Sequence, residues 1–538
     1  MTSTTTEQPA SHLYCLPARG RLRQQTGGRF ARPSPEPPPR PSGGPRPGFT
    51  RPRRGGHALL VLAACLLGAC ASPQRAAVPA APRASAAVGP NLAHLDFLGE
   101  DVVLAGDTLR FVHVYAEAPD WRFVGDDDEG IACVDDAARA AVVYLRHFET
   151  TGSARSKRTA VKLLRFVRHQ QAPSGLFYNF VWDRALRPNT DYQTSVATDV
   201  SWWTARAVWA LGTGARVLAT ADPAEAAASL AAVRRVEPHL DALLARYGET
   251  ADAGGRAFPQ WLIARTAADA TSELLLGLVA LEQAAPTPAG TRRARQFADG
   301  IGRLRFGSLA ASPWGGHAAW TGGWHGWGNS QTQALAEGVR ARVLESSALA
   351  SAVAESETLF ARLLVEGWLH EITYETAGAP AAERAFDQIA YDVRPAAVGL
   401  VRVHEATGDA RWGVMAGLAS AWFAGDNPAR TVMADPASGR GYDGIIAPDR
   451  INPNAGAEST IEAQMTLLEV SRDSVAAPWM RATSEPPRSA TRDGRSLRVR
   501  VWTAPSGRRA VVVLDASADR SSVHVGADAD AFLASLDS

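Results

Sequence analysis

Five acidic residues stand at the starts of segments with a helical pattern, and their carboxyl groups are the first candidates for chemistry: Asp135, Asp136, Asp199, Asp392 and Glu458. Two carboxyl groups that face one space can break a bond together, one as proton donor and the other as base or nucleophile. Asp136 is the first choice for the acid/base. The adjacent Asp135 cannot point the same way on a helix, so one of the two caps the helix or positions its neighbour. The alternative for all five is helix capping, because helix N-termini favour negative charge.

A tryptophan-rich stretch, SPWGGHAAWTGGWHGWGNSQTQAL (312–335), leads directly into one of these helical segments. With the start of an earlier helical segment, it supplies candidates for ligand contact: Trp202, Trp314, His317, Trp320, Trp324, His325, Trp327, Asn329 and Gln331. Flat indole faces suit the apolar faces of sugar rings, while indole N–H groups, imidazoles and amides bind hydroxyl groups. The six glycines indicate a close approach of the backbone to something, which favours a binding rim. The alternative is that the tryptophans pack on the protein itself.

Six segments that could position these residues share one form, a polar or acidic start followed by an Ala-, Leu- and Val-rich helical stretch. They begin at Cys133, Thr198, Thr271, Asn329, Tyr391 and Ala457. Their spacing of about 60 residues leaves room for a second, amphipathic helix in each interval. The pattern predicts an all-α fold, an (α/α)6 toroid of six helical hairpins over residues 94–475, with the six inner-helix N-termini at one end. The unequal spacing favours a toroid over the alternative, an open α-solenoid.

The two ends of the chain predict a lipid-anchored protein with a small C-terminal extension. Residues 1–70 contain a basic patch, a short apolar run and LGAC, which resembles a bacterial lipobox and predicts lipidation of Cys70. We expect a Pro/Ala-rich tether over 71–93 and attachment to the cell envelope, at the periplasmic face or the cell surface, with the outer membrane preferred. After a linker over 476–495, alternating residues predict a short C-terminal β-hairpin extension over 496–538.

The composition and charge of the chain limit the kinds of partner and cofactor that we expect. The chain has 538 residues, 46% of them hydrophobic, and a net charge of +1. That near-zero charge gives no reason to expect nucleic acid as a partner. The acidic run 126–129 could bind Ca²⁺ through oxygen ligands, but it lacks an EF-hand pattern and charge runs are usually solvated. We expect no metal and no cofactor.

Two longer motifs resemble a helical domain found in many bacterial glycosyltransferase-associated proteins. DDDEGIACVDDAARAAVVYL (126–145) resembles its EGY-TDD-ARA pattern, and 421–469, with YDG and N-GAEST, resembles its end. The resemblance implies a six-hairpin glycosidase-like barrel over nearly all of 95–470 and a carbohydrate context. In the unsaturated-uronyl hydrolases, which share this barrel, the working aspartates lie on the first two inner hairpins, where this chain has Asp135/Asp136 and Asp199. The candidates for substrate contact in the later motifs are Tyr391, Tyr442 and Asp443.

Three functions follow from these observations. The leading one is a glycoside hydrolase that uses paired carboxyl groups on an oligo- or polysaccharide. The second is a noncatalytic glycan-binding lipoprotein. The third is a polysaccharide lyase, in which Tyr391, Tyr442, His317 or His325 removes a proton α to a uronate carboxylate. The chain lacks a recognisable nucleotide-sugar-binding α/β domain, so we do not expect a glycosyltransferase.

Overall fold

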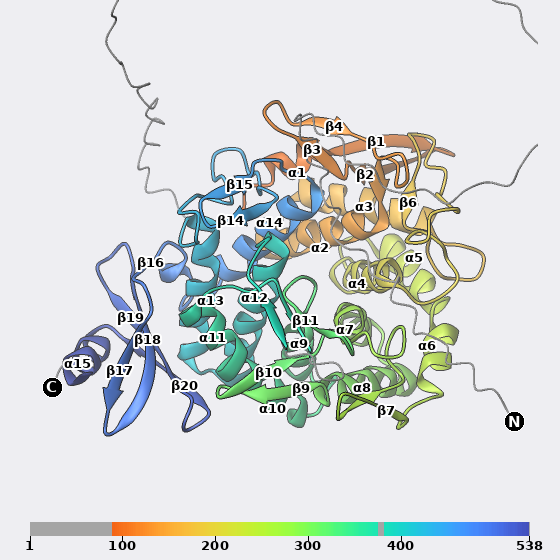
Figure 1. Cartoon of the computed structure of the whole chain (residues 1–538). Helices are drawn as coiled ribbons and strands as arrows, with labels where there is room; N and C mark the ends of the chain where they lie inside the picture. The colour runs from red at the N-terminus through yellow and green to blue at the C-terminus, as the bar shows by residue number, and fades with distance from the viewer. Residues whose placement is uncertain (1–88, 375–380, 537–538) are drawn as a thin grey trace, which may run out of the picture. The chain divides into compact units, whose positions relative to one another are not determined.

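The computed structural model describes residues 89–374 and 381–536, and its main feature is a cycle of long buried helices. We call them the inner helices: α2 (Val134–Thr151), α4 (Trp202–Val217), α7 (Ala268–Ala284), α9 (Gln331–Arg340), α12 (Ala390–Thr407) and α14 (Ala457–Ser471). Each contacts the next in chain order, and α14 contacts α2, so the contacts form a closed cycle (Figure 1). Each of the six segments expected from the sequence overlaps one inner helix.

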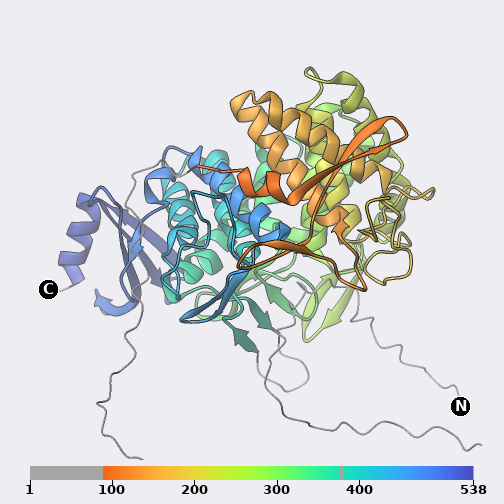
Figure 2. The ribbon, with the colours of Figure 1, turned by 90° about the horizontal axis from the view of Figure 1, so that it is seen from above.

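A second set of helices packs outside the inner ones. They are α3 (Ala154–His169), α5 (Pro223–Arg234) with α6 (Glu237–Leu244), α8 (Pro288–Gly302), α10 (Ser346–Glu355) with η1 (Ser356–Phe360) and α11 (Ala361–Glu366), and α13 (Ala410–Ser420). The helix that follows each of α2, α4, α7, α9 and α12 packs against it as a hairpin. Short α1 (Ala93–Leu98) contacts α14, as Figure 2 shows. Outer helices such as α3 and α8 bury one apolar stripe, whereas the inner helices, and α13 among the outer ones, are covered on nearly all sides.

Glycines set the tightest of the inner contacts. A Cβ on Gly212 of α4 would lie 2.3 Å from the backbone oxygen of Gly277 in α7. The absence of both side chains therefore lets these two helices touch backbone to backbone. A larger residue at either position would push the two helices apart.

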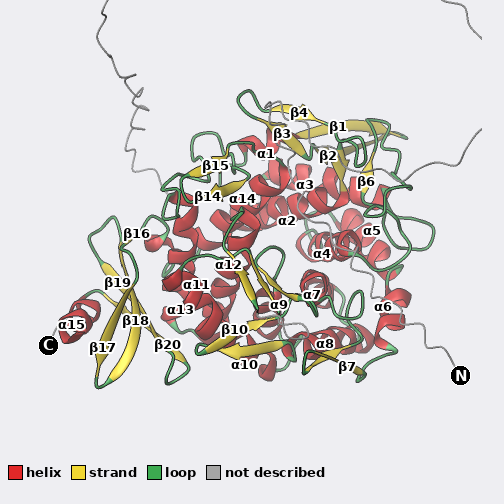
Figure 3. Cartoon of the chain, viewed as in Figure 1, coloured by secondary structure: helices red, strands yellow, loops and turns green. Residues whose placement is uncertain are grey.

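The expectation of an all-α fold is corrected by small antiparallel sheets in the connections between helices (Figure 3). Their strands are β1 (Gly99–Leu104), β2 (Asp107–Val112), β3 (Tyr115–Glu117), β4 (Arg122–Val124), β5 (Ala132–Cys133), β6 (Phe180–Val181), β7 (Thr250–Ala253), β8 (Arg256–Pro259), β9 (Arg305–Ser308), β10 (Ala311–His317), β11 (Gly323–His325), β12 (Glu371–Thr373), β13 (Ala382–Arg384), β14 (Gly444–Ala447) and β15 (Arg450–Asn452). Most of these strands are too short to show an alternating pattern. Some pair across long stretches of sequence, as β11 does with β12.

The C-terminal region is a five-stranded sheet rather than a hairpin alone. The expected hairpin is β18 (Arg495–Thr503) with β19 (Arg509–Asp515), and β16 (Thr483–Ser484), β17 (Arg488–Arg492) and β20 (Arg520–Val525) extend it. Two of these strands fall in the segment expected to be a linker. Helix α15 (Ala527–Leu536) covers a small apolar core on this sheet. The sheet packs on α11, where Arg498 forms an ion pair with Glu366 at 2.8 Å.

The expected leader, lipobox, Cys70 and most of the tether lie outside the described residues. Within residues 89–374 and 381–536, no helix combines the length and apolar character that crossing a membrane requires.

Candidate active site

The N-terminal turns of the inner helices meet in one buried group of charges, which we call the mouth cluster. Its members are Asp135, Asp136, Arg139, Arg206, Glu273, Tyr391, Arg394, Glu458 and Glu462. Ion pairs join the helices across the centre: Arg139 of α2 lies 2.9 Å from Glu462 of α14, and Arg394 of α12 lies 2.6 Å from Glu462 and 3.0 Å from Glu273 of α7. Arg206 of α4 completes the cycle, at 2.8 Å from Glu273 and 2.9 Å from Asp135.

Tyr391 occupies the middle of this network. Its hydroxyl donates to Glu273 at 2.6 Å and accepts from Arg206 at 2.8 Å. The guanidinium groups of Arg139 and Arg394 lie 4.7 and 5.1 Å from the centre of its ring. A ring face attracts cations, so Tyr391 holds the arginines in place as well as bonding them.

Two carboxylates share a single nitrogen of Arg139. Its Nη2 donates to Asp136 Oδ1 at 2.8 Å and to Glu458 Oε2 at 3.2 Å, so these two oxygens can be at most 6.0 Å apart, the sum of the two distances. The Asp136 side chain is 4% exposed and Glu458 is 35% exposed, which makes Glu458 the open carboxylate of the mouth cluster. Glu458 is therefore the more accessible of the two carboxylates, while Asp136 is enclosed and accepts a hydrogen bond from Arg139.

The mouth cluster has more acids than bases, with five carboxyl groups against three guanidinium groups. The pKa of Glu458 is raised to about 7, chiefly by burial and with a smaller contribution from Asp136, although Arg139 opposes the shift. Burial also raises the pKa of Asp136, against the opposing effect of Arg139. For Glu273, burial is outweighed by Arg206 and Arg394, and its pKa is lowered. Glu458 therefore exchanges its proton near neutral pH, whereas Glu273 stays ionised.

Residues of the two sequence motifs fix the positions of Asp135, Asp136 and Glu458. In the VDD motif, Cys133 is the N-cap of α2 and its Sγ donates to Asp136 Oδ2 at 3.2 Å. Asp135 is buried against Arg206 and accepts from Asn179 at 3.0 Å. In the YDG motif, Asp443 accepts from Gly456 N at 3.0 Å and Ser459 Oγ at 2.8 Å, which fixes the GAEST turn and hence Glu458.

The tryptophan-rich segment packs against other parts of the protein. A Cβ on Gly323 would lie 2.3 Å from Ile372 O, and one on Gly328 would lie 2.8 Å from the Trp202 ring. The six glycines were expected to mark a close backbone approach that favours a binding rim, but these two allow close contact with other parts of the protein itself. Trp327 stacks on His325 with ring centres 3.7 Å apart and lies 5.7 Å from Trp202.

The other residues of this segment have protein partners. His317 is fully buried against Glu355 at 2.8 Å, and His325 lies 2.9 Å from Asp269. Trp314 donates to Glu383 and Trp324 is buried, while Trp320 is half-buried beside Gly322. Asn329 and Gln331 are buried, and their amide nitrogens donate to the backbone oxygens of His317 and Ala318.

The three remaining candidates are Asp199, Asp392 and Tyr442. Asp199 is exposed and precedes α4, whose N-cap is Ser201. Asp392 is buried, accepts from Ile389 N at 2.9 Å and pairs with His370 at 3.0 Å, so it stabilises the start of α12. Tyr442 is half-buried, and its backbone N–H donates to Met433 O.

The acidic run 126–129 forms a turn in which Asp126 accepts from the backbone N–H groups of Asp128 and Glu129. Among the described residues, no group of three or more His, Cys, Asp or Glu side chains is arranged to hold a metal ion.

The sequence analysis missed the basic half of the mouth cluster and two of its acids: Arg139, Arg206, Glu273, Arg394 and Glu462. One signal was available, because each is a charged residue within an otherwise apolar helical stretch. A charge on a buried helix needs a partner of opposite sign, so such residues point to a common centre.

Comparison with known proteins gives structural similarity without sequence similarity. No family model matches the chain, and no curated protein matches it in sequence. Among solved structures, a sugar epimerase from a ruminal bacterium is 13% identical, over 67% of this chain and 92% of that one, with a TM-score of 0.46. The cellobiose 2-epimerase from Bacillus thermoamylovorans is 11% identical over the same shares, with a TM-score of 0.47. The unsaturated glucuronyl hydrolase from Bacillus sp. GL1 is 16% identical over 67% and 90%, with a TM-score of 0.40.

Proposed function

We propose that the chain is a carbohydrate-active enzyme that hydrolyses glycosidic bonds at the mouth cluster. The observation that carries this proposal is the Asp136–Arg139–Glu458 arrangement, in which an accessible carboxyl group with a pKa of about 7 shares a guanidinium with a second acid. Glycoside hydrolysis ordinarily requires two carboxyl groups, one that donates a proton and one that acts as base or nucleophile. A carboxyl group that titrates near neutrality can serve in either state.

The proposal includes the architecture and the location expected from the sequence. We assign the cycle of inner helices to the (α/α)6 toroid of the six-hairpin glycosidase-like proteins, close to the helical domain of glycosyltransferase-associated proteins. We also propose a lipid anchor at Cys70, which would keep the enzyme in the bacterial cell envelope next to polysaccharide substrates. The closed cycle of contacts supports the first assignment, and the lipobox pattern supports the second.

A polysaccharide lyase has less support than a hydrolase. It requires a free base, and the hydroxyl of Tyr391 is engaged by Arg206 and Glu273, while the His317 side chain is fully buried against Glu355. Burial also raises the pKa of Tyr391, which keeps the phenol protonated.

The test is turnover of a broad panel of polysaccharides and oligosaccharides by the full chain purified in detergent, with products identified by mass spectrometry. We expect a product heavier than the cleaved fragment by one water, and its loss in Asp136→Asn with the fold retained. An unsaturated product would identify a lyase. Binding without any product, unchanged in Asp136→Asn, would contradict the proposal and leave the noncatalytic glycan-binding protein.

A further inference from the structure

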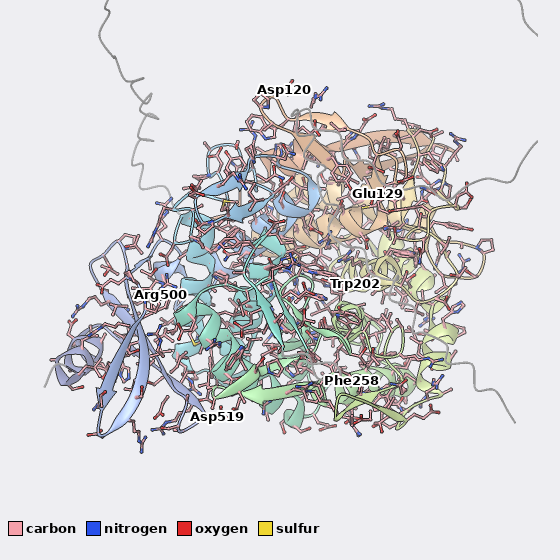
Figure 4. All side chains as sticks on the ribbon, viewed as in Figure 1. Asp120, Glu129, Trp202, Phe258, Arg500 and Asp519 are labelled. Atoms are coloured by element: carbon pink, nitrogen blue, oxygen red, sulfur yellow. The ribbon has the colours of Figure 1, made fainter. Side chains whose placement is uncertain are left out.

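A further carboxyl group, that of Glu129, lies close enough to the mouth cluster to be affected by the charges of Asp135 and Asp136. The segment 113–116 runs between the entrance to α2 and the entrance to α14: Val114 N donates to Ile131 O at 3.2 Å, and Ala457 N donates to Val114 O at 2.9 Å. Tyr115, in the middle of this segment, donates its hydroxyl proton to Glu129 Oε2 at 2.5 Å. The backbone that positions Glu458 thus also positions Tyr115, the partner of Glu129. Glu129 is labelled in Figure 4.

The turn that carries Glu129 is held rigidly. Asp126 Oδ1 accepts from Glu129 N at 3.2 Å, and the side chain of Asn189 donates to Asp128 O at 2.7 Å. A Cβ on the following Gly130 would lie 2.2 Å from Val181 O, so only glycine permits this packing. A side chain on a turn fixed in this way is already positioned before any substrate arrives.

Glu129 differs from Asp136 and Glu458 in having no cation. Within the described parts of the chain, no lysine, arginine or histidine pairs with it, whereas the other two share Arg139. The charged groups that face it are Asp126 of its own turn and Asp135 and Asp136 of α2. Burial, and then these three acids, raise the pKa of Glu129 to about 7 against the opposing hydrogen bond from Tyr115.

We propose that Glu129, rather than Asp136, is the proton donor of the hydrolysis, with Glu458 as the base and Asp136 holding Arg139 beside that base; this inference rests on the proposed function. Because Tyr115 donates to Oε2, the proton of the neutral acid lies on Oε1, which is the donor toward the glycosidic oxygen. As the bond from the anomeric carbon to that oxygen breaks, the oxygen takes the Glu129 proton. A water forms the new bond to the anomeric carbon and gives its proton to the Glu458 carboxylate. One water is consumed, and proton exchange with solvent restores both acids.

The first test observes Glu129 without a substrate. The full chain, labelled with ¹³C at glutamate carboxyl groups, is titrated by NMR, and the Glu129 signal is identified by its loss in Glu129→Gln. We expect a midpoint near pH 7 and a displaced midpoint in Tyr115→Phe, a positioning effect that a purely structural hydroxyl would not produce. A midpoint near the ordinary glutamate value of about 4.3 would overturn the inference whatever the activity.

The second test uses the leaving group. On 4-nitrophenyl and 2,4-dinitrophenyl glycosides of the sugar that the panel identifies, Glu129→Gln should lose about 10²–10⁴-fold in kcat/KM on the poorer leaving group. It should keep most activity on dinitrophenyl glycosides, which need little protonation. Glu117→Gln is the matched control, because Glu117 lies in the β3–β4 hairpin that carries Tyr115, its side chain is 43% exposed, and it pairs with Arg122. If the wild type is active and Glu129→Gln loses the same activity on both substrates, or loses none, the role of Glu129 is overturned and the proposed function stands. If the wild type is inactive, the proposed function itself is overturned.

Discussion

Two buried clusters of arginine and acid lie along the inner helices, and they differ in charge balance. The mouth cluster is at the N-terminal turns. The second, which we call the far cluster, lies further along the same helices and consists of Arg146, Glu337, Arg402 and Glu469. Arg146 lies 2.5 Å from Glu337, Arg402 lies 3.2 Å from Glu337, and Arg402 also donates to Glu469. The far cluster has two charges of each sign, whereas the mouth cluster has five acids for three arginines.

The ratio of acids to arginines in each cluster decides which of its carboxyl groups stay ionised. In the far cluster, Arg146 and Arg402 outweigh the effect of burial and lower the pKa of Glu337 to about 2. In the mouth cluster, the arginines cannot neutralise every acid, and the pKa values of Asp136 and Glu458 are raised. A balanced buried cluster therefore serves to join helices, and an acid-rich one stores protons that a reaction can use.

The largest effect that separates the clusters should be on turnover. Glu458→Gln removes the open carboxyl group and should lower kcat by about 10²–10⁴-fold. The same change removes excess negative charge, so the melting temperature at pH 8 should be unchanged or higher. The measurements are product release and thermal unfolding of the same preparation. A variant that is inactive because it is destabilised would contradict the assignment of Glu458 to chemistry.

The second effect is the reverse one, at the far cluster. Glu337→Gln removes the buried carboxylate that contacts both Arg146 and Arg402, and loss of one partner of a buried ion pair typically costs about 3–5 kcal/mol. The two arginines keep Glu469 and their partly exposed partners Glu149 and Glu405. We expect a loss of that size in the free energy of unfolding, measured in urea, with kcat of the folded protein unchanged. A loss below 1 kcal/mol would mean that the far cluster contributes no more than a surface ion pair.

The third effect is opposite pH dependence of stability. Glu458 has a folded pKa of about 7 against an ordinary 4.5, so its unfavourable contribution is absent below about pH 4.5 and grows as pH rises through 7. Glu337 has a lowered pKa, so its favourable contribution is present above about pH 4.5 and is lost as pH falls toward 2. The free energy of unfolding of Glu458→Gln, relative to that of the wild type, should therefore rise by on the order of 1–2 kcal/mol between pH 5 and pH 8. The rise is kept to this size because water partly screens the Glu458 side chain.

Urea unfolding of wild type, Glu458→Gln and Glu337→Gln at both pH values measures this difference, with Glu117→Gln as an exposed control. If Glu458→Gln and wild type keep the same difference at pH 5 and pH 8, Glu458 does not titrate in this range.

The sequence predicts the helices better than the sheets because their signals differ in length. An inner helix such as α7 presents many apolar residues in a row, and six such runs at similar spacing indicate a repeat. A strand such as β11 has three residues, and its partner β12 follows nearly fifty residues later. Pairing of that kind depends on the folded arrangement of the helices, which no local pattern contains.

The same limit applies to the candidate site. Asp136, Glu458 and Tyr391 could be selected by type and by position at a helix start. Arg139 is only three residues from Asp136, but its ion pair with Glu458 joins two helices that are distant in sequence. The hydrogen bond from Tyr391 to Glu273 also joins distant helices, so neither contact could be assigned from the sequence. The glycine-rich segment misled for a related reason: close backbone approach is visible in the sequence, but whether the neighbour is a ligand or the protein is not.

The smallest effect is expected at Asp199, which compares an acid outside the mouth cluster with those inside it. Asp199 stands at a helix start by sequence, as Asp136 does, but it is exposed, and Ser201 caps α4 in its place. Asp199→Asn should therefore leave kcat, KM and the pH profile within about twofold of wild type, since surface changes of this kind are usually within about 0.5 kcal/mol. Parallel kinetics of Asp199→Asn and Asp136→Asn make the comparison. An equal loss of turnover in Asp199→Asn and Asp136→Asn would contradict this prediction. It would mean that the catalytic acids are those on the first two hairpins, as the family resemblance implies, whether or not they contact Arg139.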